Sequence, residues 1–141
     1  MFKKILVPID PNEAEFAGVA VDYAASLAKQ NGGTVRLIGV TPILTGYVTE
    51  YLPADYDVSI EREATEKLAV LASMAKAHGV TADTVVRLGG VYPEVIDEAK
   101  AWGADLIVIS SHRPSMSTYF LGSNASQIVR HAMCSVLVLR E

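Results

Sequence analysis

A polar loop that ends at a Gly-Ser-Asn turn has the residue types of an anion-binding site. The loop spans residues 110–118 after an apolar run, and Gly122, Ser123 and Asn124 then begin a short predicted helix. Backbone N–H groups at a helix N-terminus lack partners within the helix, and the helix dipole there favours negative charge. Ordinary capping chemistry, with Asn124 and Gln127 as a cap pair, explains these residues equally well. The pattern alone leaves both interpretations open.

Polar and small residues follow the other apolar runs in the same way. They are Asp10 after the first run, Gly39 to Pro42 after the second, and Ser110, Ser111, His112 and Arg113 after the fourth. In an open parallel sheet a ligand lies beyond the C-terminal ends of the strands, where the strand order reverses. Simpler roles stay open, because Asp10 is also typical of an Asx turn, His112 of an exposed loop, and Arg113 of a surface ion pair. The residues converge only if the first and fourth strands are neighbours.

Apolar runs alternate with helix-length segments along the whole chain. We predict strands over residues 4–9, 34–40, 82–88, 106–109 and 136–139, and helices over 13–30, 59–78, 92–102 and about 124–131, with Asn12 and Ser59 as helix caps. This alternation specifies parallel strands joined by right-handed crossovers, with helices on both faces of an open α/β sheet. Charged residues place the 82–88 strand at an edge. Gly39 inside its strand predicts a close approach by another backbone or a ligand.

The segment 41–58 is irregular and unusually long for a connection. It has no clean period, two prolines and three tyrosines, Tyr47, Tyr51 and Tyr56. Segments of this length are usually lids, binding segments or disordered. The tyrosines disfavour a disordered linker, so a lid over a ligand and packing against a partner chain both stay open.

Length and charge exclude several protein classes. A chain of 141 residues predicts one domain over 1–141, and a net charge of −4 argues against binding to nucleic acid or an anionic membrane. No apolar run reaches the ~18 residues that span a bilayer, and the N-terminal apolar stretch is too short for a signal peptide. The single Cys134 agrees with a reducing compartment, so we expect a cytoplasmic protein. Three histidines and this cysteine lack metal-ligand spacing, so no protein-built metal site is expected.

Common nucleotide and phosphate motifs are missing. The chain has neither a G-x-x-x-x-G-K-[ST] loop nor a G-x-G-x-x-G turn after its first strand. A phospho-accepting receiver domain fits the alternation but needs further acidic residues beside Asp10, an Asp after the third strand and a Lys after the last. The chain has none of these, so the receiver interpretation is disfavoured.

Three stretches carry a resemblance that covers nearly the whole chain. ILVPID at the start, AxxWGADLIVISSHRP, and TYFLGSNASQIVRHAMCSVLVLR resemble the universal stress protein family, and most closely its F/G-type bacterial members. The resemblance implies a single-domain, adenine nucleotide alpha hydrolase-like fold with a twisted five-stranded parallel sheet of order 3-2-1-4-5. It also implies a homodimer and, in many members, bound ATP.

The resemblance assigns site residues in this chain. Those implied to contact the adenosine and phosphates are Pro8, Ile9, Asp10, Val40, Ile109, Ser110, Ser111, His112, Arg113, Gly122, Ser123, Asn124, Ser135 and Val136. Asp10 would bind the ribose hydroxyls, Val40 the adenine edge through its backbone, and Ser135 and Val136 the sugar or phosphate. Mg²⁺ would be held chiefly by phosphate oxygens and water, as this ion prefers.

The chain departs from the family's ATP-binding pattern, G-x-x-G, nine residues, then G-[ST]. Ser110 and Arg113 replace the two early glycines, and only eight residues separate Arg113 from Gly122. Losing glycine hinders backbone approach to phosphate, whereas His112 and Arg113 add donors. We therefore favour retained ATP or ADP binding through a variant loop.

These features lead to three functional hypotheses. The first is a dimeric, ATP-binding regulatory module in the stress response. The second is a slow ATPase, or a protein that phosphorylates or adenylylates itself, and the third is a nucleotide-free dimeric scaffold. No general base is evident in the sequence, so little turnover is expected. We expect the apolar strand over residues 136–139 to form the dimer interface, because an unpaired apolar edge invites pairing.

Overall fold

A five-stranded parallel sheet forms the centre of the computed structural model, which describes residues 1–43, 56–111 and 122–140. The strands are β1 (Lys4–Ile9), β2 (Thr34–Thr41), β3 (Thr81–Leu88), β4 (Leu106–Ser110) and β5 (Ser135–Leu139). Their order is β3-β2-β1-β4-β5, and every neighbouring pair is parallel. The predicted strand order and the predicted edge position of β3 are therefore confirmed.

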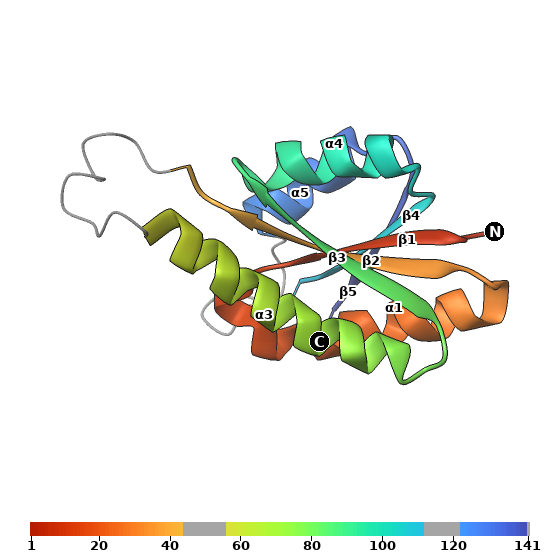
Figure 1. The fold of residues 1–141 in the computed structure, drawn as a ribbon. Helices are drawn as coiled ribbons and strands as arrows, with labels where there is room; N and C mark the ends of the chain where they lie inside the picture. The colour runs from red at the N-terminus through yellow and green to blue at the C-terminus, as the bar shows by residue number, and fades with distance from the viewer. Residues whose placement is uncertain (44–55, 112–121, 141) are drawn as a thin grey trace.

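Helices cover both faces of this sheet (Figure 1). They are α1 (Gly18–Asn31) and α3 (Tyr56–Lys76) on one face, and α4 (Val91–Trp102) and α5 (Ser123–His131) on the other. Each face buries its own apolar cluster: alanines of α1 and leucines of α3 pack on one side, and Val95, Ile107 and Ile128 lie on the other. The three central strands have mostly buried residues because both of their faces are covered.

The first helical segment differs from the prediction. Residues 13–30 do not form one helix, because a 3-10 helix, η1 (Pro11–Phe16), comes before α1 and Glu13 within it has non-helical φ/ψ of −128° and 34°. The cap is Asp10, whose Oδ1 accepts a hydrogen bond from the Asn12 N–H at 2.9 Å. Proline suits the first position of a helix, and Gly18 is a poor helix former at the junction, so the chain turns tightly before α1 begins.

Two other predicted caps do not form. Ser59 lies inside α3, which already begins at Tyr56. The N-cap of α5 is Gly122, with no side-chain capping bond. Gln127 Oε1 instead accepts a hydrogen bond from His131 Nε2, at 3.0 Å.

Gly39 is closely approached, although by side chains of α3 and η1 and not by the backbone or ligand that was predicted. A Cβ built on Gly39 would lie 3.0 Å from Leu68 Cδ1 and 3.5 Å from Pro11 Cγ. Glycine thus lets α3 pack directly on the end of β2. In the part of the chain that the structure describes, no helix is long and apolar enough to cross a bilayer.

Candidate functional site

The strand order reverses between β1 and β4. The chain proceeds outward from β1 through β2 to β3, then returns to place β4 on the other side of β1, with Ile5 opposite Leu106. The gap between the C-terminal ends of β1 and β4 is the place where open α/β sheets bind ligands. The first and fourth strands are therefore neighbours, as the convergence of the predicted site residues requires.

A cavity of about 580 Å³ lies at this edge. Its described lining comes from the ends of β1, β2 and β4, from η1, from the first three turns of α3, from the segment after β3, and from the start of α5. The volume falls within the range of roughly 300–1,000 Å³ that is usual for small-molecule sites. Both apolar and polar groups line it.

Seven of the twelve predicted site residues that the structure describes line this cavity. They are Pro8, Ile9, Asp10, Val40, Ile109, Ser110 and Asn124, contributed by three strands and one helix. Val40 is nearly buried, with 8% of its surface exposed, so only a small part of this residue faces the cavity. The arrangement offers an apolar wall beside polar groups, which suits a flat heterocycle carrying a hydroxylated or charged substituent.

Asp10 takes part in the Asx turn that the sequence left as an alternative. Its Oδ1 accepts from the Asn12 N–H, and its side chain lies on the cavity wall. A carboxylate has two oxygens with several lone pairs, so the turn leaves acceptor capacity for ligand hydroxyls. The turn also holds the carboxylate in one orientation, which lowers the entropy lost when a ligand binds.

The two neighbouring serines at the end of β4 have different surroundings. Ser110 lines the cavity. Ser111 turns to β5, where its N–H and its Oγ both donate to the Leu139 carbonyl, at 2.9 and 3.1 Å. Ser111 is therefore not among the cavity residues. The predicted roles of His112 and Arg113 lie outside the described residues.

The Gly-Ser-Asn turn lies at the start of α5, and of its three residues Asn124 lines the cavity. Gly122 is buried, with φ −60° and ψ 158°, and its carbonyl accepts from the Ser126 N–H at 3.0 Å. Asn124 and Ala125 line the cavity, whereas Gly122 and Ser123 are not in its lining. The N-terminus of α5 thus borders the cavity, as the anion-cradle interpretation requires.

The predicted ligand contacts of Ser135 and Val136 are wrong for this cavity. Ser135 pairs with Leu106, the first residue of β4, whereas Ser110 pairs with Leu139. Four residues of strand, about 13 Å, therefore separate Ser135 from the ligand edge. The physical reason is the crossover: α5 carries the chain back to the amino edge before β5 begins, so the first residues of β5 lie opposite the cavity.

One wall of the cavity comes from α3, which the sequence did not indicate as part of the site. Tyr56, Ile60, Glu63, Ala64 and Lys67 of α3 line it. Lys67 Nζ donates to the Pro11 carbonyl at 2.9 Å, which ties α3 to η1. These residues are three or four positions apart, so the sequence indicated that they share one face of the helix. No local sequence pattern indicated that α3 packs over the end of β2.

A second missed part is the turn after β3. Gly89 and Val91 line the cavity, and the Gly89 N–H donates to the Thr41 carbonyl at 2.9 Å. This part had a signal in the sequence, because the C-terminal ends of parallel strands share one edge and a Gly-Gly turn follows β3 there.

The described lining carries more negative than positive side chains, so a polyphosphate would bind here more favourably together with Mg²⁺. Three carboxylates, Asp10, Glu13 and Glu63, accompany one ammonium group, Lys67. Yet in the described residues no group of three His, Cys, Asp or Glu side chains is arranged to hold a metal ion. The lining therefore fits Mg²⁺ only as an ion held mainly by ligand phosphates and water, with oxygen groups nearby.

Comparisons with known proteins agree with the fold. Universal stress protein UspA from Lactobacillus plantarum has a TM-score of 0.81 at 23% identity, covering 99% of this chain and 98% of that one. A universal stress protein in complex with cAMP has a TM-score of 0.74 at 21% identity, covering 99% and 97%. The Archaeoglobus fulgidus universal stress protein in complex with dAMP has 0.73 at 23% identity, covering 99% and 98%.

Sequence relatives are nearer. "Universal stress protein G" of Shigella flexneri is 38% identical over 143 aligned positions, covering 99% of this chain and all of the relative. The family model described as "Universal stress protein family" matches residues 1–140. With the sheet order and the cavity at its switch point, these matches show that this chain belongs to the universal stress protein family, in which it is similar to G-type bacterial members.

Proposed function

We propose that this protein binds ATP, or another adenine nucleotide, in the cavity at the ends of β1 and β4 and acts as a dimeric regulatory module in the stress response. The observation that carries the proposal is the convergence of seven predicted nucleotide residues on one cavity at the topological switch point. Related structures hold cAMP and dAMP, which supports an adenine nucleotide as the ligand class.

Each wall of the cavity has a role in this proposal. The Asp10 carboxylate accepts from the ribose hydroxyls, and the Val40 backbone meets the adenine edge. Ser110, Asn124 and the N-terminus of α5 face the phosphates, where N–H groups and the helix dipole favour negative charge. Mg²⁺ offsets the negative charge of the phosphates beside the acidic lining.

The described lining supports binding more than turnover. Rapid hydrolysis needs an oriented water and groups that stabilise the transferring phosphoryl. Asp10 is engaged by the η1 turn and, in the proposal, by ribose, while Lys67 is bonded to the Pro11 carbonyl. We therefore expect at most slow ATP hydrolysis or self-modification, with a nucleotide-free scaffold as the remaining alternative.

The proposed assembly is a homodimer in the cytoplasm, with β5 at the interface. β5 is the edge strand beside β4, and its Val136–Leu139 portion is half-buried and apolar. A single half-buried Cys134 suits a reducing compartment.

Nucleotide released from the purified protein is the direct test. We expect denatured protein to release an adenine nucleotide, identified by mass and ultraviolet spectrum, and nucleotide-free protein to rebind Mg-ATP in calorimetry. A radioactive turnover assay then separates binding from hydrolysis. Absence of both copurified nucleotide and binding at millimolar Mg-ATP would leave only the scaffold.

A further inference from the structure

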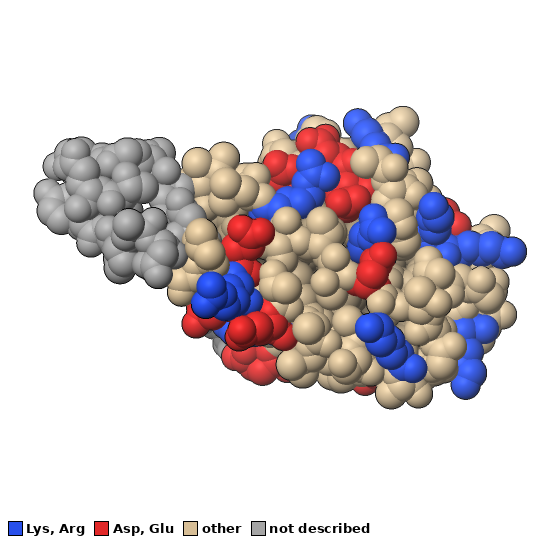
Figure 2. Space-filling model, in the orientation of Figure 1, with Lys and Arg blue, Asp and Glu red and all other residues tan. Residues whose placement is uncertain are grey.

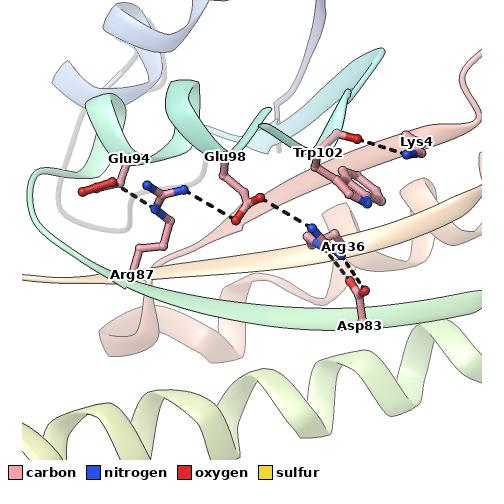
Figure 3. Close-up of polar contacts among 7 residues, drawn as sticks. All are labelled: Lys4, Arg36, Asp83, Arg87, Glu94, Glu98 and Trp102. Atoms are coloured by element: carbon pink, nitrogen blue, oxygen red, sulfur yellow. Dashed lines mark hydrogen bonds and ion pairs between the residues drawn. The ribbon is translucent and has the colours of Figure 1, made fainter. Parts of the chain in front are cut away.

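A chain of alternating charges runs beneath α4 from the cavity edge toward the opposite edge of the sheet (Figure 3). Its members, in spatial order, are Glu94, Arg87, Glu98, Arg36 and Asp83. The successive N···O distances are 3.0, 3.6, 3.5 and 2.8 Å. Figure 2 shows acidic and basic side chains interleaved on the face over β3 and α4.

The middle of this charge chain is shielded from water. Glu98 is only 8% exposed and lies between two arginines, and the Arg36 guanidinium stacks 4.5 Å from the Trp102 ring centroid. Ion pairs that are partly removed from water are screened less than surface pairs. Buried pairs give little net stability against apolar replacements, so a role beyond stability is worth seeking in what they position.

The cavity end of the chain holds a turn that lines the ligand site. Arg87 is the next-to-last residue of β3, two residues before Gly89, and Glu94 lies in the first turn of α4. A Cβ built on Gly89 would lie 2.8 Å from Glu94 Oε1, so the carboxylate packs directly against the Gly89 backbone. Arg87 Nε donates to Glu94 Oε2 at 3.0 Å and closes the turn from the other side.

The backbone of this turn has an unusual conformation that contacts from neighbouring side chains can stabilise. Gly89 has φ +147°, a region that residues with a side chain rarely adopt, and glycine loses more conformational freedom on ordering than other residues. Its N–H donates to the Thr41 carbonyl, and Thr41, Gly89 and Val91 all line the cavity.

We propose that Arg87 and Glu94 are positioning residues for the ligand site: their ion pair holds the Gly89–Val91 turn in the shape that receives the base of an adenine nucleotide. This inference rests on the proposed function. The two side chains act through the backbone of the turn, since neither is among the cavity's lining residues. Without the pair, binding must order the turn, and that cost appears as lost affinity.

Asp83 provides a matched control at the far end of the same charge chain. It lies on the same strand as Arg87 and pairs with Arg36 through both oxygens, at 2.8 and 2.9 Å. Its side chain is 54% exposed. Replacing it removes an ion pair of the network without touching the turn.

The experiment compares Glu94→Ala, Glu94→Gln and Asp83→Asn in the full chain. We expect Glu94→Ala to raise the Kd for Mg-ATP about tenfold, because an unsupported turn must be ordered on binding, and Asp83→Asn to change it less than about twofold. Glu94→Gln keeps an oxygen for Arg87 and the packing on Gly89, so it should recover most of the affinity. Amide exchange at Gly89, read by NMR without nucleotide, should speed up in Glu94→Ala and stay at the wild-type rate in Asp83→Asn.

Two results would overturn the positioning role. One is unchanged Gly89 exchange in Glu94→Ala, and the other is an equal loss of affinity in Asp83→Asn, which would indicate a general loss of stability. If the wild-type chain binds no adenine nucleotide, the proposed function fails by itself. The Gly89 exchange rates then still decide whether Glu94 holds the turn.

Discussion

Asp10 shows how one side chain serves the fold and the site together. It caps the η1 turn through the Asn12 N–H and lies on the wall of the cavity. A carboxylate can do both because it has two oxygens. Separating the two roles requires a substitution that keeps one and removes the other.

Asp10→Ser separates them, because serine is a good helix cap but its side chain is shorter and has no second oxygen to offer a ribose. We expect Asp10→Ser to keep the free energy of unfolding within about 0.5 kcal/mol of wild type. Nucleotide affinity should fall at least about tenfold, since a hydrogen bond to a charged group is lost. Calorimetric titration and thermal unfolding measure the two effects.

Asp10→Ala is the companion variant, and it should lose about 1 kcal/mol of stability as well as affinity. Equal nucleotide affinity in wild type and Asp10→Ser would show that the carboxylate has only the turn as its role.

Cys134 is a residue whose surroundings lower the reactivity of its thiol. It is half-buried just before β5, and burial raises the pKa of its thiol, with the nearby Asp105 carboxylate adding to the effect. Because the thiolate is the reactive form, a raised pKa leaves less of it at neutral pH.

Alkylation of Cys134 by iodoacetamide at pH 7 should therefore be slower than in the unfolded chain. The rate should rise as the pH approaches the raised pKa, which lies above the ordinary value for cysteine. Mass spectrometry over time measures it, with the chain in urea as reference. A native rate equal to the urea rate would contradict the protected thiol.

At the scale of elements, glycines mark where one element comes too near another for a side chain. A Cβ on Gly33 would lie 2.8 Å from the Cα and the carbonyl oxygen of Lys3, so the turn into β2 passes directly over the chain entering β1. The Thr34 N–H donates to that same carbonyl at 2.8 Å. The first two strands are thus aligned by a backbone contact that only glycine allows.

Gly33→Ala should lower the free energy of unfolding by about 1–3 kcal/mol, because the added methyl overlaps backbone atoms that cannot rotate away. Chemical denaturation measures the change.

Gly18→Ala is the matched control. Its Cβ would meet only Met74 Cε, at an ordinary 3.4 Å, so it should be neutral or stabilise by up to about 0.5 kcal/mol. Similar effects from the two substitutions would show that the Gly33 contact is not the constraint.

At the scale of the whole molecule, the two edges of the sheet differ. On β3, Asp83 and Arg87 are paired with partners from β2 and α4. On β5, the last four residues are apolar and half-buried. Charged edges resist pairing with another sheet, whereas apolar edges invite it. The asymmetry favours β5 as the contact between two copies.

Light scattering at micromolar concentration should therefore give a molar mass near twice that of the 15.1 kDa chain. Backbone amides of β5 should exchange more slowly at high concentration than on dilution, while those of β3 keep one rate. A monomer at micromolar concentration, or equal behaviour of both edges, would rule out this interface.

Much of the fold could be predicted because it depends on local patterns. Continuous apolar runs identified the central strands, since parallel strands are buried on both faces, and helix-length spacers specified the crossovers. Asp10, Ser110 and Gly89 follow strands, so their shared edge follows from the direction of the strands. The resemblance to the family supplied the strand order and the ligand class.

What the sequence by itself determined was therefore the alternation of strands and helices and the edge at which each strand ends. The tertiary structure alone decided that α3 leans over Gly39 and forms a cavity wall, that Ser111 turns to β5, and that Ser135 lies on the far edge. It also decided that Glu94 packs on Gly89. The physical reason is the sequence distance over which each feature is set. Apolar patterns and turn residues act within one element, whereas these contacts form between elements that are far apart in the sequence and meet only when the elements pack together.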